Sequence, residues 1–215
     1  MTMRLRKATL LAIIGISYLF ALRAIRTFLP TVFTNFLITK VTGTVSLFAS
    51  LAIVVFFIYF YKDYVRREQI KLRMATILVI LVSLAGLVVQ VQSLSLIFNV
   101  NVVRYPVMIC GHIDAIIPLF SAIFMLAFFV VFYRETSGKE FRRLKKATSL
   151  AVIGASFLTL LQIFVLFNYL YYLRSGRSTD LVSNKTIAFS IGIPIILFWF
   201  LASLIFFISF YKVQE

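Results

Sequence analysis

Three long apolar runs in this 215-residue chain end with almost the same seven residues. The phrase reads FFIYFYK at 56–62, FFVVFYR at 128–134 and FFISFYK at 206–212. A tyrosine followed by a cation is typical of a helix that leaves a membrane, with the ring among the lipid headgroups and the charge reaching water. Any helix that emerges into the cytoplasm tends to end in this way, so the closing phrase alone does not establish a repeat.

A second phrase opens the runs that precede these endings. It consists of basic residues followed by Ala-Thr, and it occurs at Ala8-Thr9, Ala75-Thr76 and Ala147-Thr148. Two phrases in the same order and at similar spacing favour internal duplication of a helical hairpin. The predicted copies cover residues 4–66, 71–137 and 143–213. A unit that crosses twice enters and leaves on one side, so the copies are parallel and predict a pseudo-threefold ring whose centre is either packed or hollow.

The composition places this duplication in a membrane. The chain is 62% hydrophobic and 13% charged, with a mean hydropathy of +1.02, which is more apolar surface than a water-soluble domain of this length buries. Six runs are long enough to cross a bilayer as helices, and they lack the period-two alternation of a membrane β-barrel. We therefore predict a single all-α integral membrane domain over 1–215, with segments at 8–29, 43–61, 74–98, 107–133, 147–173 and 186–211.

The net charge of +15 predicts orientation rather than nucleic-acid binding, because the basic residues gather at the ends of the apolar runs. Fifteen of the 22 Lys and Arg lie at the termini and in the second and fourth connections. The positive-inside rule then places both termini in the cytoplasm, most simply at the plasma membrane. The first segment lacks a cleavage site and is interpreted as a mature helix. We expect anionic headgroups to contact the basic connections at Arg66, Arg67, Lys71, Arg73, Arg142, Arg143, Lys145 and Lys146.

One repeat position is polar in all three copies. Arg23, Gln90 and Gln162 each follow the aligned alanine by fifteen residues, which is ~22 Å along a helix and in the outer half of the bilayer. Asp114 is predicted at a similar height and is a candidate partner for Arg23, and the neighbouring His112 is a candidate titrating group. Two explanations stay open: these residues form a polar ring or gate, or they meet water at the outer interface.

Redox, metal and catalytic chemistry find little support in the sequence. Cys110 is the single cysteine and His112 the single histidine, so neither a disulfide nor a bis-histidine haem is expected. The CGHID stretch at 110–114 has ligand-like residues without a fourth ligand. No nucleophile elbow, phosphate loop or HExxH motif occurs. We expect no enzymatic activity, no cofactor and no metal.

Two functions fit these observations. The first is a small channel or transporter whose pathway runs between the hairpins, with the polar residues as an outer gate. The second is a non-catalytic structural subunit of a larger respiratory or translocation complex, in which apolar helices pack against other membrane chains. The recurrence of the polar position favours the first. The almost uniformly apolar middle of each segment favours the second.

Overall fold

The computed structural model of the protein describes residues 3–29, 31, 36–66, 68–98, 107–136, 141–175 and 180–214. Side chains are described for all of these except residues 36, 96–97, 107–115, 172–175 and 180–190. The described chain is entirely helical and contains six long helices. They are α1 (Met3–Phe28), α2 (Phe36–Asp63), α3 (Ile70–Ile97), α4 (Val107–Glu135), α5 (Arg142–Ser175) and α6 (Asp180–Val213).

Each helix covers one predicted apolar segment, to within one residue at the C-terminal ends of α1 and α3, which confirms that prediction. Five of the six helices begin several residues before their segment, because the preceding residues include Lys, Arg and other side chains that tolerate a helix well. All six helices have a stretch long and apolar enough to cross a membrane. The chain therefore has the length and composition of a multi-pass membrane protein.

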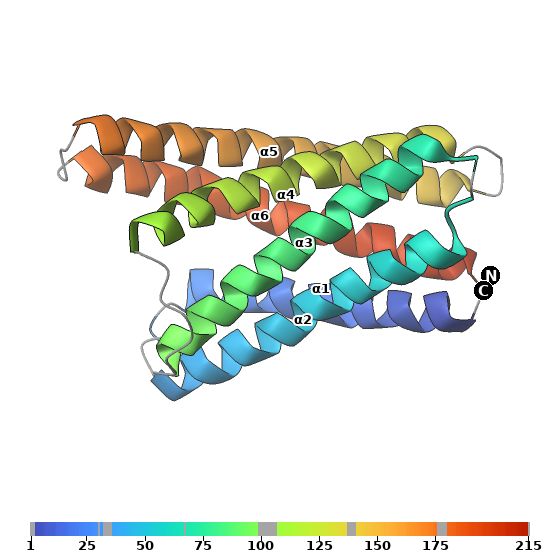
Figure 1. Cartoon of the computed structure of the whole chain (residues 1–215), viewed down its shortest axis with the longest axis horizontal. Coiled ribbons are helices and arrows are strands. Elements are labelled where there is room, and N and C mark those ends of the chain that lie inside the picture. The colour runs from blue at the N-terminus through green and yellow to red at the C-terminus, as the bar shows by residue number, and fades with distance from the viewer. Residues whose placement is uncertain are drawn as a thin grey trace.

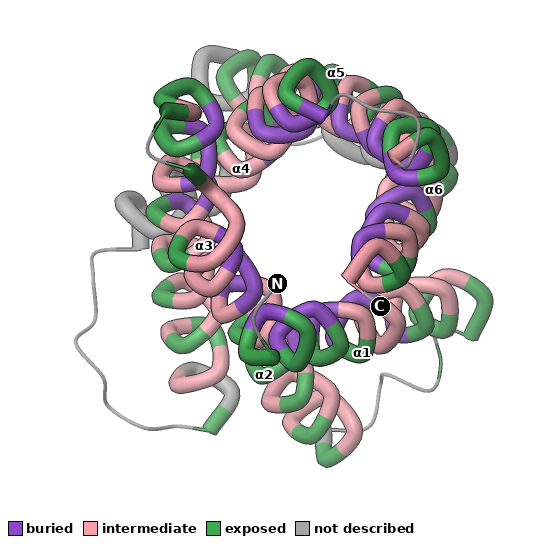
Figure 2. The backbone as a smooth tube through the Cα atoms, turned by 90° about the vertical axis from the view of Figure 1, so that its right-hand side faces the viewer, coloured by how far each residue is buried: buried purple, intermediate pink, exposed green. Residues whose placement is uncertain are grey.

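The six helices form a ring in chain order. Each helix contacts its sequence neighbours, and α1 also contacts α6, so that the first and last helices close the ring. Figure 2 shows this ring along its axis. Both ends of the described chain, the ends of α2 and α4 and the starts of α3 and α5 lie at one end of the ring, here called the terminal end, and the opposite helix ends lie at the distal end (Figure 1). Hairpins one, two and three are the pairs α1–α2, α3–α4 and α5–α6.

The inner faces of the helices follow helical periodicity. On α1 the side chains of Leu5, Ala8, Ala12 and Ile16 are buried, and they recur every three or four residues, as one face of a helix requires. Large apolar side chains on the outer faces are exposed, for example Ile14. An apolar exterior of this extent is what a helix bundle presents to lipid.

The aligned Ala-Thr phrases occupy the same environment in each hairpin. Thr9, Thr76 and Thr148 are each fully buried, and each hydroxyl donates a hydrogen bond to the leucine carbonyl four residues earlier, at 2.7–2.8 Å. Those leucines, Leu5, Leu72 and Leu144, are also fully buried. The threonine hydroxyl thus finds a partner within its own helix, which removes the penalty for placing it in an apolar core.

Candidate functional site

The terminal half of the ring is filled by nine phenylalanines, here called the aromatic plug. Three come from each of the even-numbered helices, and they are the FFxxF residues of the closing phrase. Each is at most 1% exposed. The positions i, i+1 and i+4 lie on one face of a helix, so the three helices direct them together toward the axis. The plug consists of Phe56, Phe57, Phe60, Phe128, Phe129, Phe132, Phe206, Phe207 and Phe210.

Edge-to-face contacts join the plug around the ring. In each case the second phenylalanine of one hairpin meets the first phenylalanine of the next, with interplanar angles of 77–89°. The aromatic quadrupole favours this arrangement and adds ~0.5–1.5 kcal/mol per pair beyond burial of area. The centroid distances are 5.1 Å for Phe57–Phe128, 4.9 Å for Phe129–Phe206 and 4.6 Å for Phe207–Phe56.

The last phenylalanine of each phrase completes the seal. The rings of Phe60, Phe132 and Phe210 form a triangle with centroid separations of 5.6–6.1 Å. Tyr64 lies against all three, stacked on Phe60 at 4.8 Å. Burial raises the pKa of the Tyr64 hydroxyl above its ordinary value, against the opposing effects of Arg66 and a hydrogen bond with Thr136. The described side chains thus leave the axis packed at the terminal end.

The tyrosine of each closing phrase contacts a cation of the next hairpin, at equivalent positions two residues before the aligned alanine. Arg73 Nε donates to the Tyr61 hydroxyl at 2.8 Å, and Arg6 Nε donates to the Tyr211 hydroxyl at 3.2 Å. Lys145 Nζ lies 4.9 Å from the ring centroid of Tyr133. The sequence predicts that these tyrosines end the returning helices. The contacts between neighbouring hairpins and the filling of the centre by the preceding phenylalanines are seen only in the structure.

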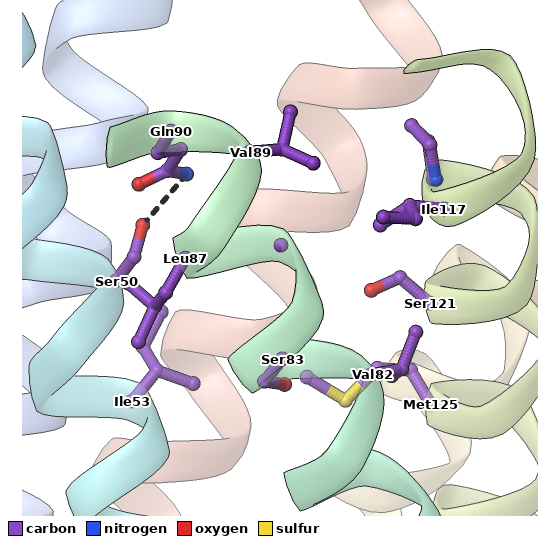
Figure 3. Close-up of a pocket in the computed structure, with 12 residues that line it drawn as sticks. Ser50, Ile53, Val82, Ser83, Leu87, Val89, Gln90, Ile117, Ser121 and Met125 are labelled. Carbon is purple, nitrogen blue, oxygen red and sulfur yellow. Dashed lines mark hydrogen bonds between the residues drawn. The ribbon is translucent and has the colours of Figure 1, made fainter. Parts of the chain in front are cut away.

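A cavity of about 350 Å³ lies on the distal side of the plug, between α2, α3 and α4. Figure 3 shows the side chains around it. The α2 residue Ile53 and the α4 residue Met125 lie one helical turn from Phe57 and Phe129 of the plug. Most of the lining is apolar, with three serine hydroxyls and one amide. The lining residues are Ser50, Ile53, Val82, Ser83, Gly86, Leu87, Val89, Gln90, Ile117, Pro118, Ser121 and Met125.

Of the three predicted polar residues, Gln90 lines this cavity. Its Nε2 donates to Ser50 Oγ at 3.1 Å, while its Oε1 is buried without a partner among the described residues. Arg23 Nε is likewise buried and unpartnered in the described part of the chain. Gln162 is half-buried. Arg23 and Gln162 continue the inner faces of α1 and α5, seven residues beyond the buried Ile16 and Ala155.

The other predicted site residues have different outcomes. Asp114 and His112 belong to α4, but their side chains lie outside the described residues, so the Arg23–Asp114 pair stays a prediction. Helix α4 lies across the ring from α1 (Figure 2). Arg67 is also outside the described residues. The remaining basic residues of the connections are exposed at the terminal end, namely Arg66, Lys71, Arg73, Arg142, Arg143, Lys145 and Lys146.

Comparison with known proteins gives no family assignment: no protein-family model, no curated protein and no solved structure matches the chain.

Proposed function

We propose that the protein is a small-solute transporter built from three parallel hairpins around a pseudo-threefold axis, with both termini in the cytoplasm. The observation that carries the proposal is a cavity lined by apolar side chains, three serines and Gln90, one helical turn from the aromatic plug. A transporter needs a binding space that is open to one side and closed to the other. The distal end corresponds to the open side and the aromatic plug to the closed gate.

The pseudo-threefold arrangement is supported by three sets of equivalent contacts. The plug phenylalanines, the tyrosine–cation pairs and the buried Ala-Thr phrases each repeat once per hairpin. In the first two sets the third hairpin contacts the first in the same way as the first contacts the second. Duplicated hairpins that pair head to tail around a ring give this pattern.

The polar position at the distal end suits a gate. Arg23 and Gln90 each keep a buried polar atom unpartnered among the described residues, and such atoms cost about 1–3 kcal/mol when they stay unsatisfied. Water or a passing solute at this level would satisfy them. The guanidinium of Arg23 would also disfavour cations, so the proposed solutes are neutral or anionic.

Opening the plug tests the proposed pathway. The variant Phe60→Ala/Phe132→Ala/Phe210→Ala removes the aromatic triangle, and purified protein in liposomes should then leak a small neutral solute that the parent retains. A matched control, Phe48→Ala/Phe120→Ala/Phe157→Ala, removes three exposed phenylalanines and should stay tight. A plug variant that keeps its helical circular dichroism and its monodisperse elution but does not leak would contradict an axial pathway.

The packed terminal half also favours the alternative of a structural subunit. Nine buried phenylalanines rigidify the ring and leave its apolar exterior available to other membrane chains. Native mass spectrometry after gentle solubilisation separates the two functions. A transporter should appear alone or as a homo-oligomer, whereas stoichiometric partner chains would identify a subunit of a larger complex.

A further inference from the structure

We propose that the cavity between α2, α3 and α4 is a binding site for a small, uncharged, mainly apolar molecule that carries one hydrogen-bonding group, such as a medium-chain alcohol. The proposal deepens the transport function and rests on it, because it names the class of solute that the cavity selects. Three independent features of the described residues lead to it: a glycine that leaves space, a valine that separates two helices, and the chemistry of the lining.

The first feature is Gly86, which leaves the cavity open. Its equivalents eleven residues after the aligned alanine are Leu19 in hairpin one and Leu158 in hairpin three. A Cβ added at Gly86 would meet nothing within 4 Å. Glycine in a helix interior is ~0.5–1 kcal/mol less favourable than alanine. Close packing therefore does not require this glycine, and it leaves open space at a position where the other two hairpins carry leucine.

The second feature is Val82, which stands where the other hairpins have glycine. A Cβ on Gly15 would lie 2.7 Å from the Ala49 carbonyl oxygen, and a Cβ on Gly154 would lie 3.3 Å from the Ala202 Cβ. Helices α1 and α2, and likewise α5 and α6, thus pack closely at these glycines. Val82 occupies the equivalent position in α3, and its side chain prevents the same close approach to α4.

Helices α3 and α4 accordingly enclose a space. Figure 3 shows Val82 of α3 beside Met125 of α4, with Ser121 further along α4. In Figure 1 the axis of α3 crosses from α4 at the terminal end to α2 at the distal end. Hairpin two departs from the other copies at two positions that line this cavity, Val82 and Gly86.

The third feature is the lining, which defines the ligand class. The lining is mainly apolar, and none of its described residues is charged, so an ion would find no counter-charge among them. Gln90 Oε1 has no partner among the described residues, and a ligand hydroxyl could donate to it. About 350 Å³ corresponds to a dozen water volumes of ~30 Å³ each, which is room for a molecule of about ten to twelve non-hydrogen atoms.

Photolabelling with a diazirine-bearing decanol tests the site. The unmodified protein is reconstituted in phosphatidylcholine vesicles and labelled. Peptide mapping should then place the adducts on the cavity residues of α3 and α4. Excess decanol should suppress them, and excess decane should do so much less. Gly86→Leu, which installs the residue of the other hairpins, should reduce cavity labelling roughly tenfold, equivalent to about 1.4 kcal/mol. Ala21→Leu adds the same bulk at an exposed position of α1 and should label like the parent.

Two further variants keep the test decisive. Gly86→Ala fills part of the cavity without a steric clash and should give intermediate labelling. This variant shows whether a loss of labelling in Gly86→Leu comes from the filled cavity rather than from misfolding. Gln90→Leu should retain labelling but lose the preference for decanol over decane as competitor. Equal labelling of the parent and Gly86→Leu, or adducts confined to exposed faces, would overturn the site. If the plug variant leaks while the cavity stays unlabelled, the transport function stands and this solute class falls.

Discussion

The ring of Phe207 in α6 meets the ring of Phe56 in α2 edge to face, with centroids 4.6 Å apart and planes at 77°. These residues belong to the last and the first hairpin, so their contact joins the two ends of the ring and completes the plug. The other two pairs of this type, Phe57–Phe128 and Phe129–Phe206, join hairpins that follow one another in the chain. The closure of the ring and the seal on its axis therefore depend on the same side chains.

Truncating a plug residue should destabilise the protein strongly. Phe60→Ala removes a fully buried ring that contacts the plug residues of both other hairpins, and large-to-small core changes of this kind cost about 3–5 kcal/mol. Phe48→Ala removes a ring that is 63% exposed on the same helix. Thermal unfolding in detergent should show a large decrease in the midpoint for Phe60→Ala and a small one for Phe48→Ala. Equal unfolding midpoints for the two variants would show that the plug does not stabilise the fold.

One substitution at two glycines should have opposite effects. Gly15→Ala places a methyl group 2.7 Å from the backbone oxygen of Ala49, and the helices must separate, at a cost of about 1–3 kcal/mol. Gly86→Ala places it in open space and should be neutral or stabilising by up to ~1 kcal/mol through helix propensity. Denaturant titration of the two variants in one detergent checks the sign of each change. A stabilised Gly15→Ala would contradict the close packing of α1 and α2.

The ends of the chain should cross-link. Gln214 Nε2 donates to Thr9 Oγ1 at 3.0 Å, so Thr9→Cys/Gln214→Cys in a Cys110→Ser background should react with a short bifunctional thiol reagent. After cleavage at a protease site inserted between residues 136 and 141, the cross-linked protein should still migrate as one chain. In the matched pair Thr76→Cys/Gln214→Cys, Thr76 lies on α3 and Gln214 directly follows α6, and these two helices do not contact each other among the described residues. This pair should separate into two fragments, and its efficient cross-linking would be inconsistent with the ring.

Alkaline pH should weaken the seal through Tyr64. Burial raises the pKa of this hydroxyl in the folded protein, so an unfolded chain releases the proton at lower pH than the folded chain does. The contribution to stability is fully present below the unfolded pKa of ~10 and decreases as the pH rises above it. Tyr64→Phe should lose less thermal stability than the parent as the pH rises from ~9 to ~11, a range that brackets the unfolded pKa of ~10. Identical losses would show that Tyr64 does not titrate in this range.

Much of the fold could be predicted because apolar length and basic ends are local properties of the sequence. The six helices agree with the predicted segments, and both termini share one end of the ring. The aligned Ala8, Ala75 and Ala147 all face the interior. The role of the plug was missed, although the spacing of Phe56, Phe57 and Phe60 carried the signal. Three aromatic residues on one helix face, repeated in every copy, indicate a shared core rather than a lipid contact.

The candidate site could be predicted only in part. The polar repeat position led to Gln90, which lines the cavity, but a pattern shared by three copies cannot show which copy differs functionally. That information lies in the departures of hairpin two, Val82 for glycine and Gly86 for leucine. Their meaning depends on which side chains face each helix across the ring, and this is a tertiary property. Sequence spacing specifies the face of a helix but not its partner.

Thiol accessibility tests most directly whether the cavity is open at the distal end and closed by the plug. Ser121→Cys in the cavity and Phe57→Cys in the plug are made separately in a Cys110→Ser background, with the exposed Ile14→Cys as the lipid-facing control. A small, membrane-impermeant methanethiosulfonate is then applied to each side of oriented vesicles. We expect Ser121→Cys to react from the distal side alone, whereas Phe57→Cys and Ile14→Cys should stay unmodified from both sides. Reaction of Phe57→Cys from the terminal side, or an inert Ser121→Cys, would contradict this expectation.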